Sequence, residues 1–279
     1  MPEGDSLHRV AQLLHPKLAG QRLVGLSLIR SAARTDGLLG STIERVEARG
    51  KNLLVHFAVG WSLHVHLKMN GRVRLYPRAT APKVPLSATS AVLDTEAHRV
   101  LVYTAPIARL LRTRDLLGDF HLRGLGPDLL GETFDLAEAC TRLSLHARRP
   151  LGEAIMDQSV MAGIGNVWKS ELCFNLRLDP FAPVAAHTES ERSALISLAR
   201  TQMFDNVYGK KSALPDPFAA RGERETRMDR RQGEHVLSVY ERAGKPCFDC
   251  GTTIEMERQG EQRRSTYFCP QCQPRRGEP

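Results

Sequence analysis

The sequence has no run of eighteen apolar residues. Its first twenty residues carry Glu3, Asp5, Arg9 and Lys17, with no uninterrupted hydrophobic stretch among them. A membrane-spanning helix needs about twenty consecutive apolar residues, and a secretory signal needs an apolar core. No internal repeat appears either. We therefore expect a cytoplasmic protein that does not associate with a membrane.

Cysteine is too scarce and too clustered for a disulfide framework, since the 279 residues include only six. Four of them form two CxxC pairs separated by eighteen residues, which is the pattern of a four-cysteine zinc site: Cys247, Cys250, Cys269 and Cys272. We expect one structural Zn²⁺ per chain, without which this mini-domain does not fold. Cys140 and Cys173 lie in apolar helical contexts and are expected to be small buried side chains.

The size and charge of the chain suggest its architecture and a class of partner. Its 279 residues are enough for two domains with cores of their own. It carries 39 Lys and Arg against 31 Asp and Glu, which gives a net charge of +8 and an isoelectric point near 9.4. This basic excess favours a polyanionic partner such as nucleic acid.

Apolar periodicity changes from strands to helices along the chain. Residues 5–15 predict an amphipathic helix with Asp5 or Ser6 as its N-cap, and residues 21–104 predict the strands of an antiparallel sandwich. A T-x-x-E capping box begins at Thr188. The later helices are expected over 133–147, 151–161, 166–176 and 193–204, and residues 209–235 are expected to form a charged mobile loop.

His64 and His66 alternate with Leu63, Val65 and Leu67, so they share one face of a predicted strand. Their spacing is compatible with a metal, but no third ligand is visible in the sequence. We expect both to be solvated polar positions.

The chain begins Met-Pro-Glu, and Pro2 would carry a secondary amine once Met1 is removed. Such an amine is a nucleophile that can attack a carbonyl carbon. Many chains begin Met-Pro without any chemical role. Whether Pro2 is catalytic therefore has to be judged from the other segments of the chain.

Three further segments present groups that suit phosphate. MAGIGN at 161–166 places two glycines before a helix N-terminus, although it also fits an ordinary turn between helices. Lys51 follows Gly50 at a strand start, and Arg263 and Arg264 precede the second CxxC pair. Taken alone, a lysine such as Lys51 is usually an ordinary surface residue, and solubility of the surface is the alternative for the two arginines.

Taken together, the segments PEG, RGKxLL, HLKMNGR, LGPD, DQSxMAGIGN and CxxC…RSTYFCPQCQ resemble the formamidopyrimidine-DNA glycosylase and endonuclease VIII family of base-excision repair enzymes. The resemblance spans almost the whole chain. It implies an α+β multidomain fold, with DNA crossing a cleft between the two halves. The implied domains are an N-terminal antiparallel β-sandwich over 1–125, a helix-two-turn-helix domain over 126–239 and a zinc-finger β-hairpin over 240–279.

The resemblance also implies roles for single residues. Pro2 matches the nucleophile and Glu3 the proton donor. Met69 matches the apolar wedge that fills the space left by a flipped-out lesion. Lys51, Asn166 and Arg264 match family positions that contact phosphates. The resemblance also assigns Lys51 and Arg264 to proton transfer.

The implied protein is a bifunctional DNA glycosylase and AP lyase that acts on damaged DNA. It removes a base through a Schiff base on Pro2 and cleaves the strand by β,δ-elimination. We expect a monomer associated with the nucleoid, which needs no catalytic metal and no diffusible cofactor.

Two departures from the family pattern bear on activity. Asp5 and Ser6 stand where members commonly carry Pro and Glu, so neither inherits a catalytic role, and capping is their expected function. RLLRTRDLLGDF replaces the DPRRFG segment of the formamidopyrimidine branch, which favours the endonuclease VIII branch and oxidised pyrimidines. The alternatives are an 8-oxoguanine-preferring glycosylase and a non-catalytic zinc protein that binds damaged DNA.

Overall fold

The computed structural model describes residues 2–29, 35–80, 89–209 and 237–277. The chain divides into two compact units. Met1–Arg123 belong to the first, and Gly124–Ala213 with Glu223–Pro279 belong to the second. Within the described residues, no helix is long and apolar enough to cross a membrane.

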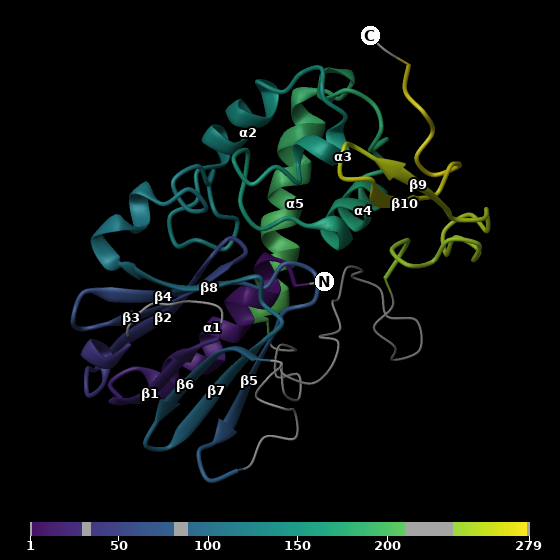
Figure 1. The fold of residues 1–279 in the computed structure, drawn as a ribbon. Helices are drawn as coiled ribbons and strands as arrows, with labels where there is room; N and C mark the ends of the chain where they lie inside the picture. The colour runs from purple at the N-terminus through teal and green to yellow at the C-terminus, as the bar shows by residue number, and fades with distance from the viewer. Residues whose placement is uncertain (1, 30–34, 81–88, 210–236, 278–279) are drawn as a thin grey trace. The chain divides into compact units, whose positions relative to one another are not determined.

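The first unit is built on two four-stranded antiparallel sheets, which confirms the predicted sandwich (Figure 1). One sheet has the order β1-β6-β7-β5, with the bounds Leu23–Leu28, Thr89–Thr95, His98–Tyr103 and Arg72–Pro77. The other has the order β2-β3-β4-β8, with the bounds Ile43–Arg49, Asn52–Phe57, Trp61–His66 and Ile107–Arg112. Strands β6 and β8 were not predicted. A 3₁₀ turn, η1, covers Asp36–Leu38, and another, η3, covers Thr113–Gly118.

Helix α1 spans Gly4–Leu18 and packs beside β2 and β3. Leu7, Val10 and Leu14 are buried, as their helical spacing predicts. The N-cap is Glu3, so the prediction of Asp5 or Ser6 as the cap was wrong. Ser6 instead occupies the third helical position, where its hydroxyl accepts a hydrogen bond from the Glu3 N–H at 3.4 Å.

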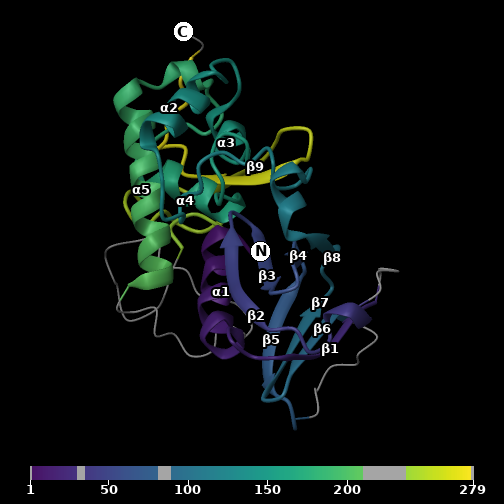
Figure 2. The ribbon, with the colours of Figure 1, turned by 90° about the vertical axis from the view of Figure 1, so that its left-hand side faces the viewer.

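The described part of the second unit contains four α-helices and the β-hairpin of β9 and β10 (Figure 2). Helix α5 begins at the predicted capping box, since Thr188 and Glu191 bond reciprocally. A helix was predicted over 151–161, but the helix observed there ends at Ala154, so the prediction was wrong beyond that residue. The segment predicted as a charged loop lies outside the described residues apart from Gly209. The bounds are α2 Leu136–Ser144, α3 Leu151–Ala154, α4 Asn166–Asn175, η4 Val184–Ala186, α5 Glu189–Tyr208, β9 Glu255–Gln259 and β10 Arg264–Phe268.

Candidate functional site

The start of α1 lies at the same end of the first unit as the turn between β2 and β3. The Gly20 N–H, just past the helix, donates to the Ile43 oxygen at 2.8 Å, and the Val46 N–H donates to His15 Nδ1 at 3.1 Å. Helix and strand therefore run antiparallel, side by side in Figure 2. Their lengths are similar, about 22 Å for the helix and about 23 Å for the strand. The beginning of α1 is thus level with the end of β2.

This geometry brings three of the predicted residues to one end of the unit. Pro2 and Glu3 precede the first turn of α1, and Lys51 follows β2 in the tight turn to β3. Glu3 is fully buried, whereas Pro2 and Lys51 are partly exposed. Gly50 adopts a φ of 52°, which explains why this turn contains glycine.

Met69 lies at the same end, in the turn that follows β4. The Gly71 N–H donates to the Leu67 oxygen at 2.9 Å, and a Cβ at Gly71 would lie 2.5 Å from that oxygen, so the turn requires glycine. Met69 is 52% exposed and is not a core residue of a strand. His66, the last residue of β4, pairs in register with Asn52, which follows Lys51.

His64 is not solvated, contrary to the prediction, because a buried polar network encloses it. His64 Nε2 lies 2.9 Å from the Asn52 Oδ1, and Arg109 Nε donates to His64 Nδ1 at 3.3 Å. Arg109 also binds both carboxylate oxygens of Asp119, at 2.7 and 2.6 Å. Burial first, and then the charge of Arg109, lower the pKa of His64 to about 4, so the ring is neutral.

His66 and a second hydrogen-bonded network, around His56, lie on the same face of the sheet β2-β3-β4-β8 as His64. Burial and then the charge of Lys51 lower the pKa of His66 to about 4. The ring of His56 lies 2.8 Å from Ser62 Oγ and 3.0 Å from the Glu47 carboxylate. Its hydrogen bond to Glu47 lowers the pKa of that carboxyl to about 2. Sequence patterns did not reveal either network.

In the second unit, the MAGIGN segment leads into α4 and is held by a side chain that we did not predict. Gln158 Oε1 accepts from the Gly163 N–H at 3.1 Å, and its Nε2 donates to the oxygens of Met156 and Ile164 at 2.7 and 3.1 Å. Gly163 has a φ of 123°, where other residues would be strained. These bonds fix the loop that precedes Asn166, the first residue of α4.

Asn166 and Arg264 lie near each other. The Asn166 Nδ2 donates to the Ser265 Oγ at 3.1 Å, and Ser265 follows Arg264 on β10. The Arg264 guanidinium is partly exposed at the start of that strand and donates to Gln262 Oε1 at 2.8 Å. Asn166 Oδ1 is buried and has no hydrogen-bond partner within the described part of the chain.

Two buried charged residues of α4 form hydrogen bonds with β10 and with the chain that precedes the first CxxC pair. Lys169 is fully buried, and its Nζ donates to the Ser265 oxygen at 3.1 Å and to Thr266 Oγ1 at 2.6 Å. Glu171, also fully buried, accepts from the N–H groups of residues 238, 239 and 240 at 2.7–2.9 Å. Helix α4 thus fixes both β10 and the chain that leads into the first CxxC pair.

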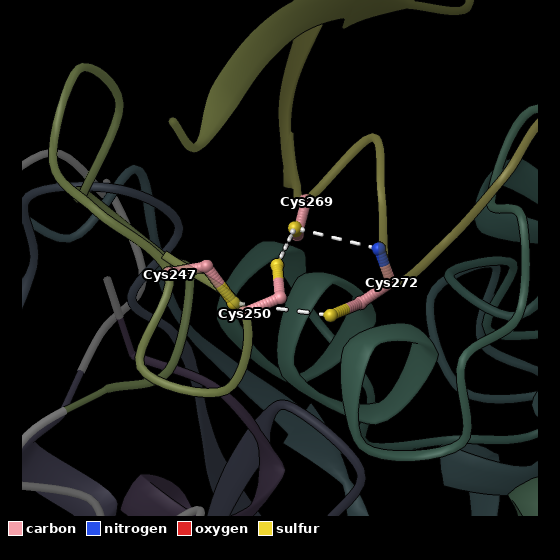
Figure 3. A group of neighbouring side chains, drawn as sticks. All are labelled: Cys247, Cys250, Cys269 and Cys272. Atoms are coloured by element: carbon pink, nitrogen blue, oxygen red, sulfur yellow. Dashed lines mark hydrogen bonds between the residues drawn. The ribbon is translucent and has the colours of Figure 1, made fainter. Parts of the chain in front are cut away.

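The four paired cysteines converge, as Figure 3 shows. Their sulfur atoms all lie within 4.8 Å of one another, with 3.9 Å between Cys247 and Cys272 and 3.5 Å between Cys250 and Cys269. These separations suit the edges of a tetrahedron with zinc–sulfur bonds of about 2.3 Å. The Asp249 N–H lies 3.5 Å from the Cys247 sulfur, and the Cys272 N–H lies 3.5 Å from the Cys269 sulfur.

The other two cysteines are not ligands. Cys173 is fully buried in the helical core, and burial raises the pKa of its thiol to about 12. Cys140 is partly buried and packs against the same core. Cys173 is the small buried side chain that its sequence context predicts, whereas Cys140 is only partly buried.

Comparison with known proteins gives three family matches that together cover most of the chain. Residues 1–108 match the formamidopyrimidine-DNA glycosylase N-terminal domain, and residues 125–214 match the H2TH domain of the same enzymes. Residues 244–275 match a zinc finger found in formamidopyrimidine-DNA glycosylase and isoleucyl-tRNA synthetase. This match and the four clustered cysteines show that the protein holds one structural zinc ion.

The relatives and similar structures agree with these matches. The chain is 36% identical over 274 residues to DNA-(apurinic or apyrimidinic site) lyase Nei2 of Mycolicibacterium smegmatis, covering 98% of this chain and 99% of that one. It is 34% identical to probable endonuclease 8 2 of Streptomyces coelicolor, covering 98% and 94%. The structure of MutM (Fpg) from Thermus thermophilus matches with a TM-score of 0.78 and 32% identity, covering 99% and 100%.

The strand-rich first unit, the helical segment and the four-cysteine hairpin therefore coincide, in chain order, with the three family matches. The chain belongs to the formamidopyrimidine-DNA glycosylase and endonuclease VIII family.

Proposed function

We propose that this protein removes oxidised pyrimidines from DNA through Pro2 and then cleaves the strand by β,δ-elimination. Membership of the family supports the broader statement, a DNA glycosylase with AP lyase activity in base-excision repair. The observation that carries the finer proposal is the position of Pro2 and Glu3 at the end of the first unit where Lys51 and Met69 also lie.

The chemistry begins with the amine of Pro2, exposed once Met1 has been removed. Its lone pair forms a bond to C1′ of the damaged nucleotide, and the bond from C1′ to the base breaks. The departing base takes the electron pair of that bond together with the proton released from the Pro2 nitrogen. Glu3 donates a proton to the sugar ring oxygen, the ring opens and an iminium forms between Pro2 and C1′.

The same intermediate accounts for strand cleavage. The iminium acidifies the hydrogens at C2′, and loss of one expels the 3′ phosphate; a second elimination expels the 5′ phosphate. Water then hydrolyses the iminium and regenerates Pro2. Lys51 neutralises the phosphates next to the damaged nucleotide, and Asn166 and Arg264 contact the same backbone.

Met69 has the role of filling the space that the flipped nucleotide leaves. A flexible apolar side chain that is 52% exposed is suited to enter a base stack, whereas a core residue would not be available. Asp5 and Ser6 take no part in the reaction. Ser6 accepts a hydrogen bond from the backbone of Glu3, and Asp5 accepts one from the Ser6 N–H at 2.8 Å.

The proposal also includes a division into three domains at residues 125 and 239, and a monomer that acts on nucleoid DNA in the cytoplasm. Zinc serves the structure of the finger, and no reaction step passes through it. The name endonuclease 8 that several relatives carry and the absence of a DPRRFG segment support the pyrimidine preference.

Borohydride reduction with abasic-site DNA tests the enzymatic proposal. The wild-type protein should give a covalent adduct, and Pro2→Gly should lose most of it. Absence of an adduct with the wild type would leave a non-catalytic DNA-binding protein. Rates on duplexes that contain thymine glycol, dihydrouracil or 8-oxoguanine test the substrate class, and fastest removal of 8-oxoguanine would overturn the pyrimidine preference.

A further inference from the structure

The side chain of Asn52 closes the turn that carries Lys51. Strand β2 ends at Arg49 and β3 begins at Asn52, and these two residues pair in register, so Gly50 and Lys51 form the turn between them. Asn52 is buried, and its Nδ2 donates to the Arg49 oxygen across the turn at 3.1 Å. This hydrogen bond fixes the backbone on both sides of Lys51.

His64 determines which way the Asn52 amide points. Arg109 Nε donates to His64 Nδ1 at 3.3 Å, and His64 Nε2 lies 2.9 Å from Asn52 Oδ1. A neutral imidazole carries one N–H, and a guanidinium only donates. Because Nδ1 accepts from Arg109, the ring proton is on Nε2 and is donated to Asn52 Oδ1. The NH₂ group of Asn52 is therefore the one that faces the Arg49 oxygen.

The far end of this chain of hydrogen bonds is held by an ion pair. His64 and Arg109 pair in register on β4 and β8, so their side chains share one face of the sheet. Arg109 Nη2 donates to both oxygens of Asp119, at 2.7 and 2.6 Å. The donors thus all point in one direction, from Arg109 to the turn. Reversing one of them would leave buried polar groups without partners, which is costly, so a single arrangement is favoured.

A second buried histidine on the same face of the sheet makes contacts elsewhere. The ring of His56 lies 2.8 Å from Ser62 Oγ and 3.0 Å from the Glu47 carboxylate, and Ser62 Oγ lies 2.9 Å from Thr113 Oγ1. Neither Glu47 nor Thr113 belongs to the turn between β2 and β3. The two histidines are therefore alike in burial and differ in what they hold.

We propose that Asn52 and His64 are positioning residues for Lys51, which keep its turn in the conformation that presents the ammonium group to a DNA phosphate. The inference rests on the proposed function, because it takes Lys51 as a phosphate contact. A lysine side chain has many rotamers, so its ammonium group is placed accurately only if the backbone that carries it is fixed. Both residues act from within the sheet and do not touch the DNA.

Single-turnover rates of strand cleavage test this role, measured on abasic-site DNA with saturating protein so that binding does not limit the rate. Lys51→Ala shows how much rate is lost with the lysine. His64→Leu and Asn52→Leu should each lower the rate about tenfold or more, because a displacement of about 1 Å can cost a hundredfold. In the Lys51→Ala background neither substitution should lower the rate further, since no lysine is left to position.

His64→Gln and His56→Leu are the matched controls. A glutamine amide can accept from Arg109 through its oxygen and donate to Asn52 through its nitrogen, so His64→Gln should restore the wild-type rate. His56→Leu removes an equally buried imidazole from the same face of the sheet. It should lower the urea midpoint of unfolding about as much as His64→Leu does, yet cleave at the wild-type rate. Asn52→Leu carries the same test if His64→Leu does not fold.

A wild-type rate for His64→Leu and Asn52→Leu would overturn the inference. An equal loss of rate in His56→Leu, or further loss in the Lys51→Ala background, would also overturn it, because a general loosening of the sheet would then explain the effect. Each of these results, with a wild type that still forms the borohydride adduct, would leave the proposed function intact. A wild-type rate for Lys51→Ala would instead refute the proposed role of Lys51 and this inference with it.

Discussion

His64 should make the stability of the first unit depend on pH. The ring is completely buried, and its pKa falls from an ordinary 6.5 to about 4, mainly through burial and then through the charge of Arg109. Between these values the unfolded chain binds a proton that the folded unit does not bind. The stabilisation is therefore complete above pH 6.5 and is lost as the pH falls towards 4.

The size of the effect follows from linkage. Stability should fall by up to about 1.4 kcal/mol per pH unit, and by about 2.5 kcal/mol in total between pH 7 and pH 4.5. His64→Gln removes this titration while His66 and the carboxylates still titrate. The difference in slope between the two proteins therefore isolates His64.

The chain's two tryptophans make the assay selective, because Trp61 lies in the first unit and Trp168 in the second. Labelling with 5-fluorotryptophan gives one ¹⁹F resonance for each unit, which Trp61→Phe assigns. Urea titrations at pH 7, 6, 5 and 4.5 then report the unfolding of each unit separately. Parallel pH dependences of the wild type and His64→Gln, read from the Trp61 resonance, would refute the reasoning.

Three further predictions concern the second unit. Chelation of zinc, or Cys250→Ser, should abolish DNA binding while the Trp61 resonance remains that of the folded unit; unchanged affinity without zinc would contradict this. Arg264→Ala should reduce the slope of log Kd against log salt by about 1, and an equal slope would exclude a phosphate contact. Lys169→Met should keep zinc but weaken DNA binding several-fold, because the β10 oxygens it binds lose their buried donor. Wild-type affinity of the zinc-loaded variant would show that Lys169 does not position the hairpin.

Local patterns in the sequence predicted the elements whose partners are nearby. The zinc site follows from the spacing of four cysteines, and the start of α5 follows from Thr188 and Glu191, which lie three residues apart. The sandwich follows from strands with one clear apolar face. In each case the deciding contacts are within a few residues or are set by a period that the sequence shows directly.

The remaining features depend on distant partners. Strand β8 was missed because its two arginines resemble a solvated segment, yet Arg109 is neutralised by Asp119 ten residues later. His64 was predicted to be solvated because nothing near it indicates Arg109, which lies 45 positions away. Strand β6 was missed because Thr89, Ser90 and Asp94 interrupt its apolar pattern although all three are buried.

The chemical roles of Pro2, Glu3 and Lys51 came from resemblance to a family, since a Met-Pro start alone carries little information. The structure adds that the beginning of α1 is level with the end of β2, which brings Pro2 and Glu3 to the same end of the unit as Lys51. No short sequence pattern indicates this arrangement. The network that joins His64 to Arg109 and Asp119 could not be predicted, because it depends on how the segment that contains Asp119 lies against the sheet.

Peptide mapping of the adduct is the most direct test of the proposed nucleophile. Wild-type protein is incubated with abasic-site DNA, reduced with borohydride, digested and analysed by tandem mass spectrometry. The account predicts a deoxyribose remnant on the nitrogen of Pro2, in a peptide that lacks Met1. A remnant on Lys51 or any other amine, or a peptide that retains Met1 and still carries the remnant, would contradict it.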